Sequence, residues 1–138
     1  MKKILKKKTK FNYIQSCGTY NTEILVSVGT NYKELLACAK RLKLAKKNIK
    51  ALEDDKEEIL PLMERVACFM NLPTGSILWI KEYEDEWTFY EYLIHEIFHA
   101  VYLMLGQDQR MMKEDEAMAY QLEFLFREIR RKLQNHFK

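Results

Sequence analysis

Glycine, proline, cysteine and histidine are all scarce in this sequence. Four Gly and two Pro among 138 residues are too few for a β-sandwich or barrel, in which turn signals recur every ~8–12 residues. We therefore expect a helix-rich chain. The length predicts one domain, and a domain of this size buries roughly two thirds of its unfolded surface without needing disulfides.

The three cysteines, Cys17, Cys38 and Cys68, are far apart among apolar residues. An odd number without a CxxC pair argues against a disulfide framework and against a zinc ribbon. We expect reduced, small hydrophobic side chains in a reducing, cytoplasmic compartment. No secretion signal is expected, because four of residues 6–10 are lysines. The most apolar stretch, residues 89–105, is interrupted by Glu and His and is shorter than the ~20 residues that cross a bilayer.

Basic residues are concentrated in the first part of the chain. Residues 1–50 hold 13 of the 23 Lys and Arg but only 2 of the 20 Asp and Glu. We interpret residues 1–10 as a basic flexible tail and residues 11–138 as one domain. The basic half is compatible with nucleic-acid contact. A solvated helix face is favoured instead, because no aromatic residues alternate with the lysines to form a stacking surface.

The apolar patterns predict an α+β fold with a small sheet packed on helices. Residues 11–28 favour a β-hairpin with its turn at 17–21, and residues 77–83 favour a strand that pairs with residues 24–28. Helices are predicted at about 32–47, at about 53–70 with Pro61 near the start or at a kink, at about 84–106, and from about 112 to the end. The helix of residues 84–106 is apolar almost all round, so we expect it to be central.

This central helix contains the sequence His95-Glu96-Ile97-Phe98-His99, an HExxH motif. Residues four apart on a helix lie one above the other, so both imidazoles can bind one metal ion while Glu96 lies beside its bound water. The alternative is a set of buried polar residues with hydrogen-bond partners. That alternative requires several partners in an apolar core, because each unpaired group costs ~1–3 kcal/mol. The pattern therefore predicts a zinc site.

Catalytic zinc sites use three protein ligands and leave one position for water. The third ligand is sought among the downstream acidic residues, and periodicity alone does not choose among Asp108, Glu114, Asp115 and Glu116. At ~100° per residue, Asp115 shares a stripe with apolar core positions, whereas Glu116 shares a face with Ala119, Tyr120 and Glu123. Ala119 is small, which favours a close approach of this face to the central helix.

The motif and the segment Glu116-Ala117-Met118-Ala119-Tyr120 together resemble the gluzincin pattern HExxH…ExxA. The resemblance covers roughly residues 76–127 and is closest to short, single-domain members often found in bacteriophage genomes. It implies His95, His99 and Glu116 as zinc ligands and Glu96 as general base. It also implies that the strand of residues 77–83 is the edge that pairs with an extended substrate. Tyr120 stands where many relatives of the immunity-regulator branch have Asn.

The leading functional hypothesis is a zinc-dependent metallopeptidase acting on a peptide or protein substrate. Tyr102 and Tyr120 are candidates for stabilising the transition state, although such tyrosines more often line a core. The alternative is a non-catalytic module that uses the zinc site as a structural clamp and could contact nucleic acid through the basic half. A closed site with four protein ligands would favour the clamp, and a site with an open position would favour the enzyme.

Overall fold

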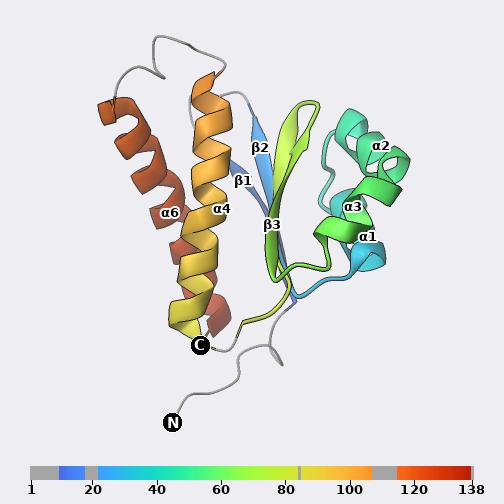
Figure 1. Cartoon of the computed structure of the whole chain (residues 1–138), viewed down its shortest axis with the longest axis horizontal. Coiled ribbons are helices and arrows are strands. Elements are labelled where there is room, and N and C mark those ends of the chain that lie inside the picture. The colour runs from blue at the N-terminus through green and yellow to red at the C-terminus, as the bar shows by residue number, and fades with distance from the viewer. Residues whose placement is uncertain (1–9, 18–21, 84, 107–114, 138) are drawn as a thin grey trace.

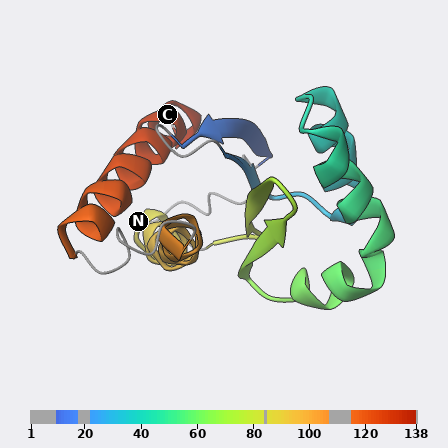
Figure 2. The same ribbon diagram turned by 90° about the horizontal axis from the view of Figure 1, so that it is seen from above.

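The computed structural model describes residues 10–17, 22–83, 85–106 and 115–137, with the backbone alone for residues 115–117 and 135–137. The predicted basic tail, residues 1–10, thus lies almost wholly outside the described residues. Within the described part, the chain forms a four-stranded mixed sheet covered by helices on both faces (Figures 1 and 2). The α+β class predicted from the sequence is confirmed.

The sheet has the order β1-β2-β4-β3. Its strands are β1 (Phe11–Ser16), β2 (Glu23–Val28), β3 (Ala67–Leu72) and β4 (Gly75–Ile80). The pairs β1–β2 and β3–β4 are antiparallel, whereas β2 and β4 are parallel. The first hairpin and the partner of β4 are therefore as predicted. The prediction that residues 77–83 form the edge is wrong, because β4 lies between β2 and β3, and β3 is the edge strand.

Helices α4 (Glu86–Gly106) and α6 (Asp115–Phe137) cover one face of the sheet. They pack on alternate strand residues such as Val26, Leu78 and Ile80, which are completely buried. The other face is covered by α1 (Tyr32–Arg41), α2 (Lys46–Asp54) and α3 (Lys56–Leu62), which pack on the intervening strand residues. The alternation of side chains along each strand thus gives two separate cores.

The helical layer of α1, α2 and α3 differs from the sequence prediction in two places. The single helix expected at 32–47 is broken after Arg41, where Lys43 adopts a φ of 62°. The helix expected at about 53–70 is also wrong, because α3 ends at Leu62 and residues 67–72 form the strand β3. Burial of this apolar run between two helical layers overrides its helical periodicity.

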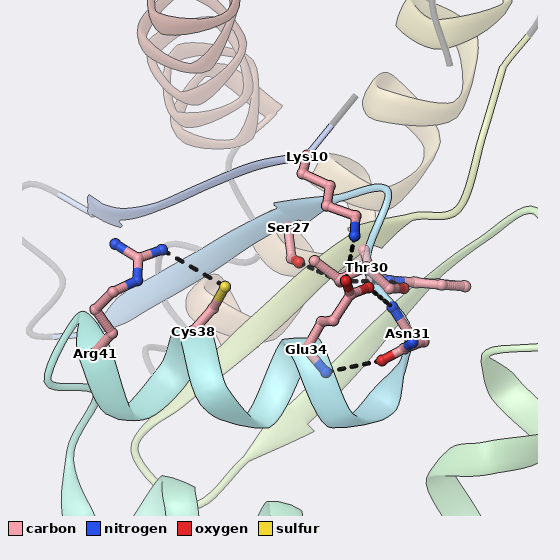
Figure 3. Close-up of polar contacts among 8 residues, drawn as sticks. Lys10, Ser27, Thr30, Asn31, Glu34, Cys38 and Arg41 are labelled. Atoms are coloured by element: carbon pink, nitrogen blue, oxygen red, sulfur yellow. Dashed lines mark hydrogen bonds and ion pairs between the residues drawn. The ribbon is translucent and has the colours of Figure 1, made fainter. Parts of the chain in front are cut away.

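The connection from β2 to α1 is held by polar contacts (Figure 3). Asn31 caps α1 by accepting a hydrogen bond from the Glu34 backbone N–H at 2.8 Å, and the Glu34 carboxylate accepts from the Asn31 backbone at 3.0 Å. Lys10 forms an ion pair with the same carboxylate. Below this turn, the indole N–H of buried Trp79 donates to the Thr30 carbonyl oxygen at 2.9 Å. These contacts fix α1 against the sheet.

Candidate metal centre

Helix α4 places the HExxH motif between the sheet and solvent. Asp85 accepts a hydrogen bond from the Thr88 backbone N–H at 2.9 Å, which satisfies a donor in the first turn. Phe89, Leu93 and Ile97 are fully buried, and they anchor the helix in the core shared with the sheet and α6. The opposite side of the helix is exposed. Helix α4 packs against both the sheet and α6, in line with the central position expected for it, although one of its sides is exposed.

The two histidines of the motif project together from the exposed side of α4. Their Nε2 atoms are 3.3 Å apart, and both side chains are exposed. Two nitrogen ligands at 2.0–2.1 Å from a tetrahedral zinc ion would be separated by about 3.3–3.4 Å. The spacing of these two nitrogen atoms would allow one metal ion to bind both of them, and the identity of that ion as zinc stays a prediction.

Glu96 is the buried polar residue of the motif, with 6% of its surface exposed. One of its carboxylate oxygens lies within 4.8 Å of the imidazole nitrogens of His95 and His99. Burial raises the pKa of this carboxyl above its ordinary value, and the charges of His95, His99 and Arg65 oppose that rise. A buried carboxyl with a raised pKa beside two candidate metal ligands is suited to accepting a proton.

A cavity of about 620 Å³ opens over the motif and reaches β3 at the edge of the sheet. Phe69 of β3 stacks on the His99 ring, with centroids 6.1 Å apart. The cavity is lined by residues of α4, of β3 and of the segment before β3: Arg65, Val66, Ala67, Cys68, Phe69, Glu91, Tyr92, His95, Glu96 and His99. The motif therefore faces an open cleft beside the edge strand.

The candidate transition-state tyrosines occupy other positions. Tyr102 is on α4 but is 53% exposed, and Tyr120 is on α6 and is 66% exposed. Neither residue lines the cavity described above, whereas Tyr92 does. Tyr92 is thus the tyrosine that the structure brings to the motif, and its position three residues before His95 is the sequence signal that would have indicated it.

The third zinc ligand stays a prediction. Asp108 and Glu114 lie outside the described residues, as do the side chains of Asp115 and Glu116, although the backbone of these last two belongs to α6. The residues that share the face of Glu116 are described further along the helix, namely Ala119, Tyr120 and Glu123, and all are exposed. The described part of this face is thus open to solvent, and the close approach to α4 that Ala119 would permit stays a prediction.

The contact between α4 and α6 lies away from the two histidines. Tyr90 of α4 meets Phe126 of α6, with ring centroids 5.9 Å apart. Tyr90 is about 140° round the helix from His95, counting ~100° per residue. The inward stripe of α6 contains Leu125, Ile129 and Leu133, and Asp115 is closer in helical phase to this stripe than Glu116 is. Because the inward stripe of α6 contacts a side of α4 away from the two histidines, helical phase alone does not select Asp115 or Glu116 as a ligand.

The three cysteines differ in burial. Cys17 and Cys68 are buried, Cys38 is half-buried, and all three are free thiols.

The basic residues at the junction of α1 and α2 are exposed, on the opposite face of the sheet from the HExxH motif (Figure 1). Two lysines of this region pair with acids, Lys40 with Glu53 and Lys50 with Asp54.

Comparisons with protein-family models, curated proteins and solved structures find no match to this chain. Among the described helices, none is both long and apolar enough to span a membrane. The functional argument therefore rests on the residues of the motif and on their surroundings.

Proposed function

We propose that this chain is a zinc-dependent metallopeptidase. The observation that carries the proposal is the placement of His95 and His99, whose Nε2 atoms are 3.3 Å apart beside the carboxylate of buried Glu96. Two imidazoles with a neighbouring carboxylate are the donor set of zinc hydrolases that activate water. Both histidines are exposed to an open cleft. This exposure favours a site that a substrate can reach, rather than a closed structural clamp.

His95 and His99 would hold the zinc ion, with Glu116 as the third ligand that the gluzincin resemblance implies. When bound, zinc lowers the pKa of a coordinated water toward ~7 and polarises a carbonyl group. Glu96 takes the proton from the attacking water and delivers it to the nitrogen of the departing amine, so the peptide bond breaks without a free amide anion. Burial of Glu96 assists the first transfer, because a raised pKa makes its carboxylate a stronger base towards the water proton.

The substrate would bind as an extended strand along β3. This edge strand lines the cleft through Ala67, Cys68 and Phe69, directly opposite the motif. An edge strand offers unpaired backbone N–H and C=O groups to an extended peptide, whatever that peptide's side chains are. In this role β3 replaces the strand of residues 77–83 that the family resemblance implied, because β4 is paired along both of its edges.

The test combines metal content with hydrolysis. Protein purified without chelators should contain one zinc ion per chain by elemental analysis, and it should cleave members of a proteome-derived peptide library, detected by mass spectrometry. Glu96→Gln should keep the zinc and lose cleavage by orders of magnitude, because glutamine has nearly the same shape but cannot accept the proton. Undiminished cleavage by Glu96→Gln would exclude this mechanism, and full zinc occupancy with no cleavage would favour the structural clamp.

A further inference from the structure

Arg65 occupies the turn between α3 and β3 and lines the same cleft as the HExxH motif. Its backbone N–H donates to the Leu62 carbonyl oxygen at 3.2 Å, which fixes the turn two residues before β3 begins. The side chain is exposed at the end of the cleft where the edge strand starts. No motif pointed to this residue in the sequence, because it lies in a connection between elements.

The guanidinium of Arg65 is available for a ligand. Within the described part of the chain, no ion pair joins it to an acidic side chain, although several other cations have such partners. Its side chain lines the cleft together with His95, Glu96 and His99, and it stands two residues before the first residue of β3. Arg65 is therefore close enough to the reacting centre to interact with a bound peptide.

We propose that Arg65 binds a carboxylate of the substrate and so directs the protease to peptides with a negative charge beside the scissile bond. This inference rests on the proposed metallopeptidase function. Guanidinium presents a planar pair of donors that matches a carboxylate in a bidentate arrangement, which gives geometric selectivity as well as attraction. Glu91 lines the same cleft, and its negative charge disfavours a substrate carboxylate at any position closer to Glu91 than to Arg65.

The direction of β3 assigns the side of the scissile bond on which this carboxylate lies. β3 begins at Ala67, next to Arg65, and the last of its residues that line the cleft is Phe69, which stacks on His99. Antiparallel pairing is slightly more stable per residue than parallel pairing, so the peptide would run in the opposite sense along β3. Its C-terminal part then lies at the Arg65 end. The carboxylate is thus expected on the C-terminal side of the bond that is cut.

Two chemical groups supply a carboxylate there, namely an acidic side chain and the free C-terminus of a short peptide. Peptides of identical sequence distinguish them. An Asp or Glu replaced by Asn or Gln removes only the side-chain charge, and an amidated C-terminus removes only the terminal charge. We expect cleavage to fall by roughly tenfold or more when the recognised carboxylate is removed, which is the scale of a charge-assisted bidentate contact.

The decisive variants are Arg65→Gln and Arg65→Glu, compared with Arg41→Gln as a matched control on the opposite face of the sheet. Cleavage profiles on the peptide library should lose the acidic preference in Arg65→Gln and change to a basic preference in Arg65→Glu. Arg41→Gln should retain the wild-type profile. An acidic preference unchanged in both Arg65 variants would overturn this inference while leaving the proposed function intact.

Binding to metal-free protein gives a readout that does not depend on catalysis. The best-cleaved library peptide and its charge-neutral counterpart should differ by roughly tenfold in dissociation constant for the metal-free wild-type chain. The difference should disappear in Arg65→Gln, whose folding is checked by circular dichroism. Equal affinities for both peptides would contradict the role of Arg65. Absence of cleavage by the zinc-loaded wild type would instead overturn the proposed function, and the inference with it.

Discussion

The two helical layers of this molecule differ in what they leave exposed. Helices α1, α2 and α3 are short, bury one apolar side on the sheet and present mainly charged residues to solvent. Helices α4 and α6 are 21 and 23 residues long. On α4, large apolar side chains remain exposed beside the histidines: Trp87, Ile94, Phe98 and Tyr102. In the other layer, Leu60 of α3 is also 41% exposed, but on α4 several such side chains occur on one helix, and a larger exposed apolar surface indicates a binding role.

The difference indicates a division of roles between the layers. The layer of α1, α2 and α3 completes the core on its own face of the sheet, around the fully buried side chains of Leu35 and Leu52. The layer of α4 and α6 completes the core on the other face and also carries the HExxH motif at the sheet edge. Substitutions in the first layer should therefore change stability, and substitutions on the outer side of α4 should change metal binding or activity.

The largest expected effect is loss of zinc when either histidine is replaced. His95→Ala and His99→Ala should each abolish stoichiometric metal, because the remaining protein ligands leave zinc largely to solvent. The free energy of unfolding of the metal-free protein should change by no more than about 0.5 kcal/mol, since both side chains are exposed. Elemental analysis and urea unfolding measure the two effects. His136→Ala, the remaining histidine, is the control and should keep its metal.

The acids at the start of α6 test the third ligand. Glu116→Ala should weaken zinc binding by orders of magnitude if the gluzincin pattern holds. Glu114→Ala and Asp115→Ala should cost only the ~0.3–1 kcal/mol of an acid near a helix N-terminus. Zinc titrations of the three variants decide between them. Loss of metal in Asp115→Ala with retention in Glu116→Ala would show that the residue on the inward stripe of α6 is the ligand.

The free energy of unfolding should depend more on the layer of α1, α2 and α3 than on the outer side of α4. Leu35→Ala removes a side chain that is completely buried between α1 and the sheet, and it should destabilise the protein by about 2–5 kcal/mol while zinc binding is retained. Ile94→Ala is the matched change on the outer side of α4, where the side chain is 46% exposed, and it should cost less than about 1 kcal/mol. Similar losses in urea unfolding for both variants would contradict the division of roles.

The effect that vanishes at neutral pH, and therefore comes last, concerns the two buried thiols, one in each core. Burial raises the pKa of Cys17 and that of Cys68 from the ordinary 9.0 to about 12. Below pH 9 both thiols are protonated in the folded and unfolded states, so they add no pH dependence. As the pH rises from 9 towards 12, only the unfolded chain loses these protons, and stability falls. Urea unfolding across this range should show a shallower decline for Cys17→Ala and for Cys68→Ala than for wild type.

The parts of the fold that sequence patterns predicted are those with long, consistent signals. The apolar spacing of α4 continues from Phe89 to Leu105, and the helix ends at Gly106 as expected. By contrast, the break after α1 has neither Gly nor Pro to mark it, since Lys43 takes the positive φ. β3 was missed because Ala67–Leu72 is a short apolar run, for which periodicity does not distinguish a buried strand from a helix.

The candidate site also has a part that local patterns predict and a part that they do not. His95, Glu96 and His99 follow from the helical period, so their grouping was predictable from spacing on one helix. Tyr92 shares their helix, so the same spacing would have indicated it. Arg65 and Phe69, by contrast, enter the cleft through the position of β3 beside α4, and this position depends on the order of strands in the sheet. No local pattern contains that order, and the residues of a cleft that come from different elements are therefore found only after the topology is known.

The two tryptophans lie in different environments, so their intrinsic fluorescence reports on two different parts of the molecule. Trp79 is 1% exposed in the core beneath α1, whereas Trp87 is 78% exposed at the start of α4. Indole emission shifts to longer wavelength in water, and a soluble quencher reaches only an exposed ring. A single-tryptophan variant, Trp87→Phe or Trp79→Phe, thus isolates the signal of one layer. Loosening of the sheet core and occupation of the outer side of α4 by a ligand can then be followed separately, without attaching a dye.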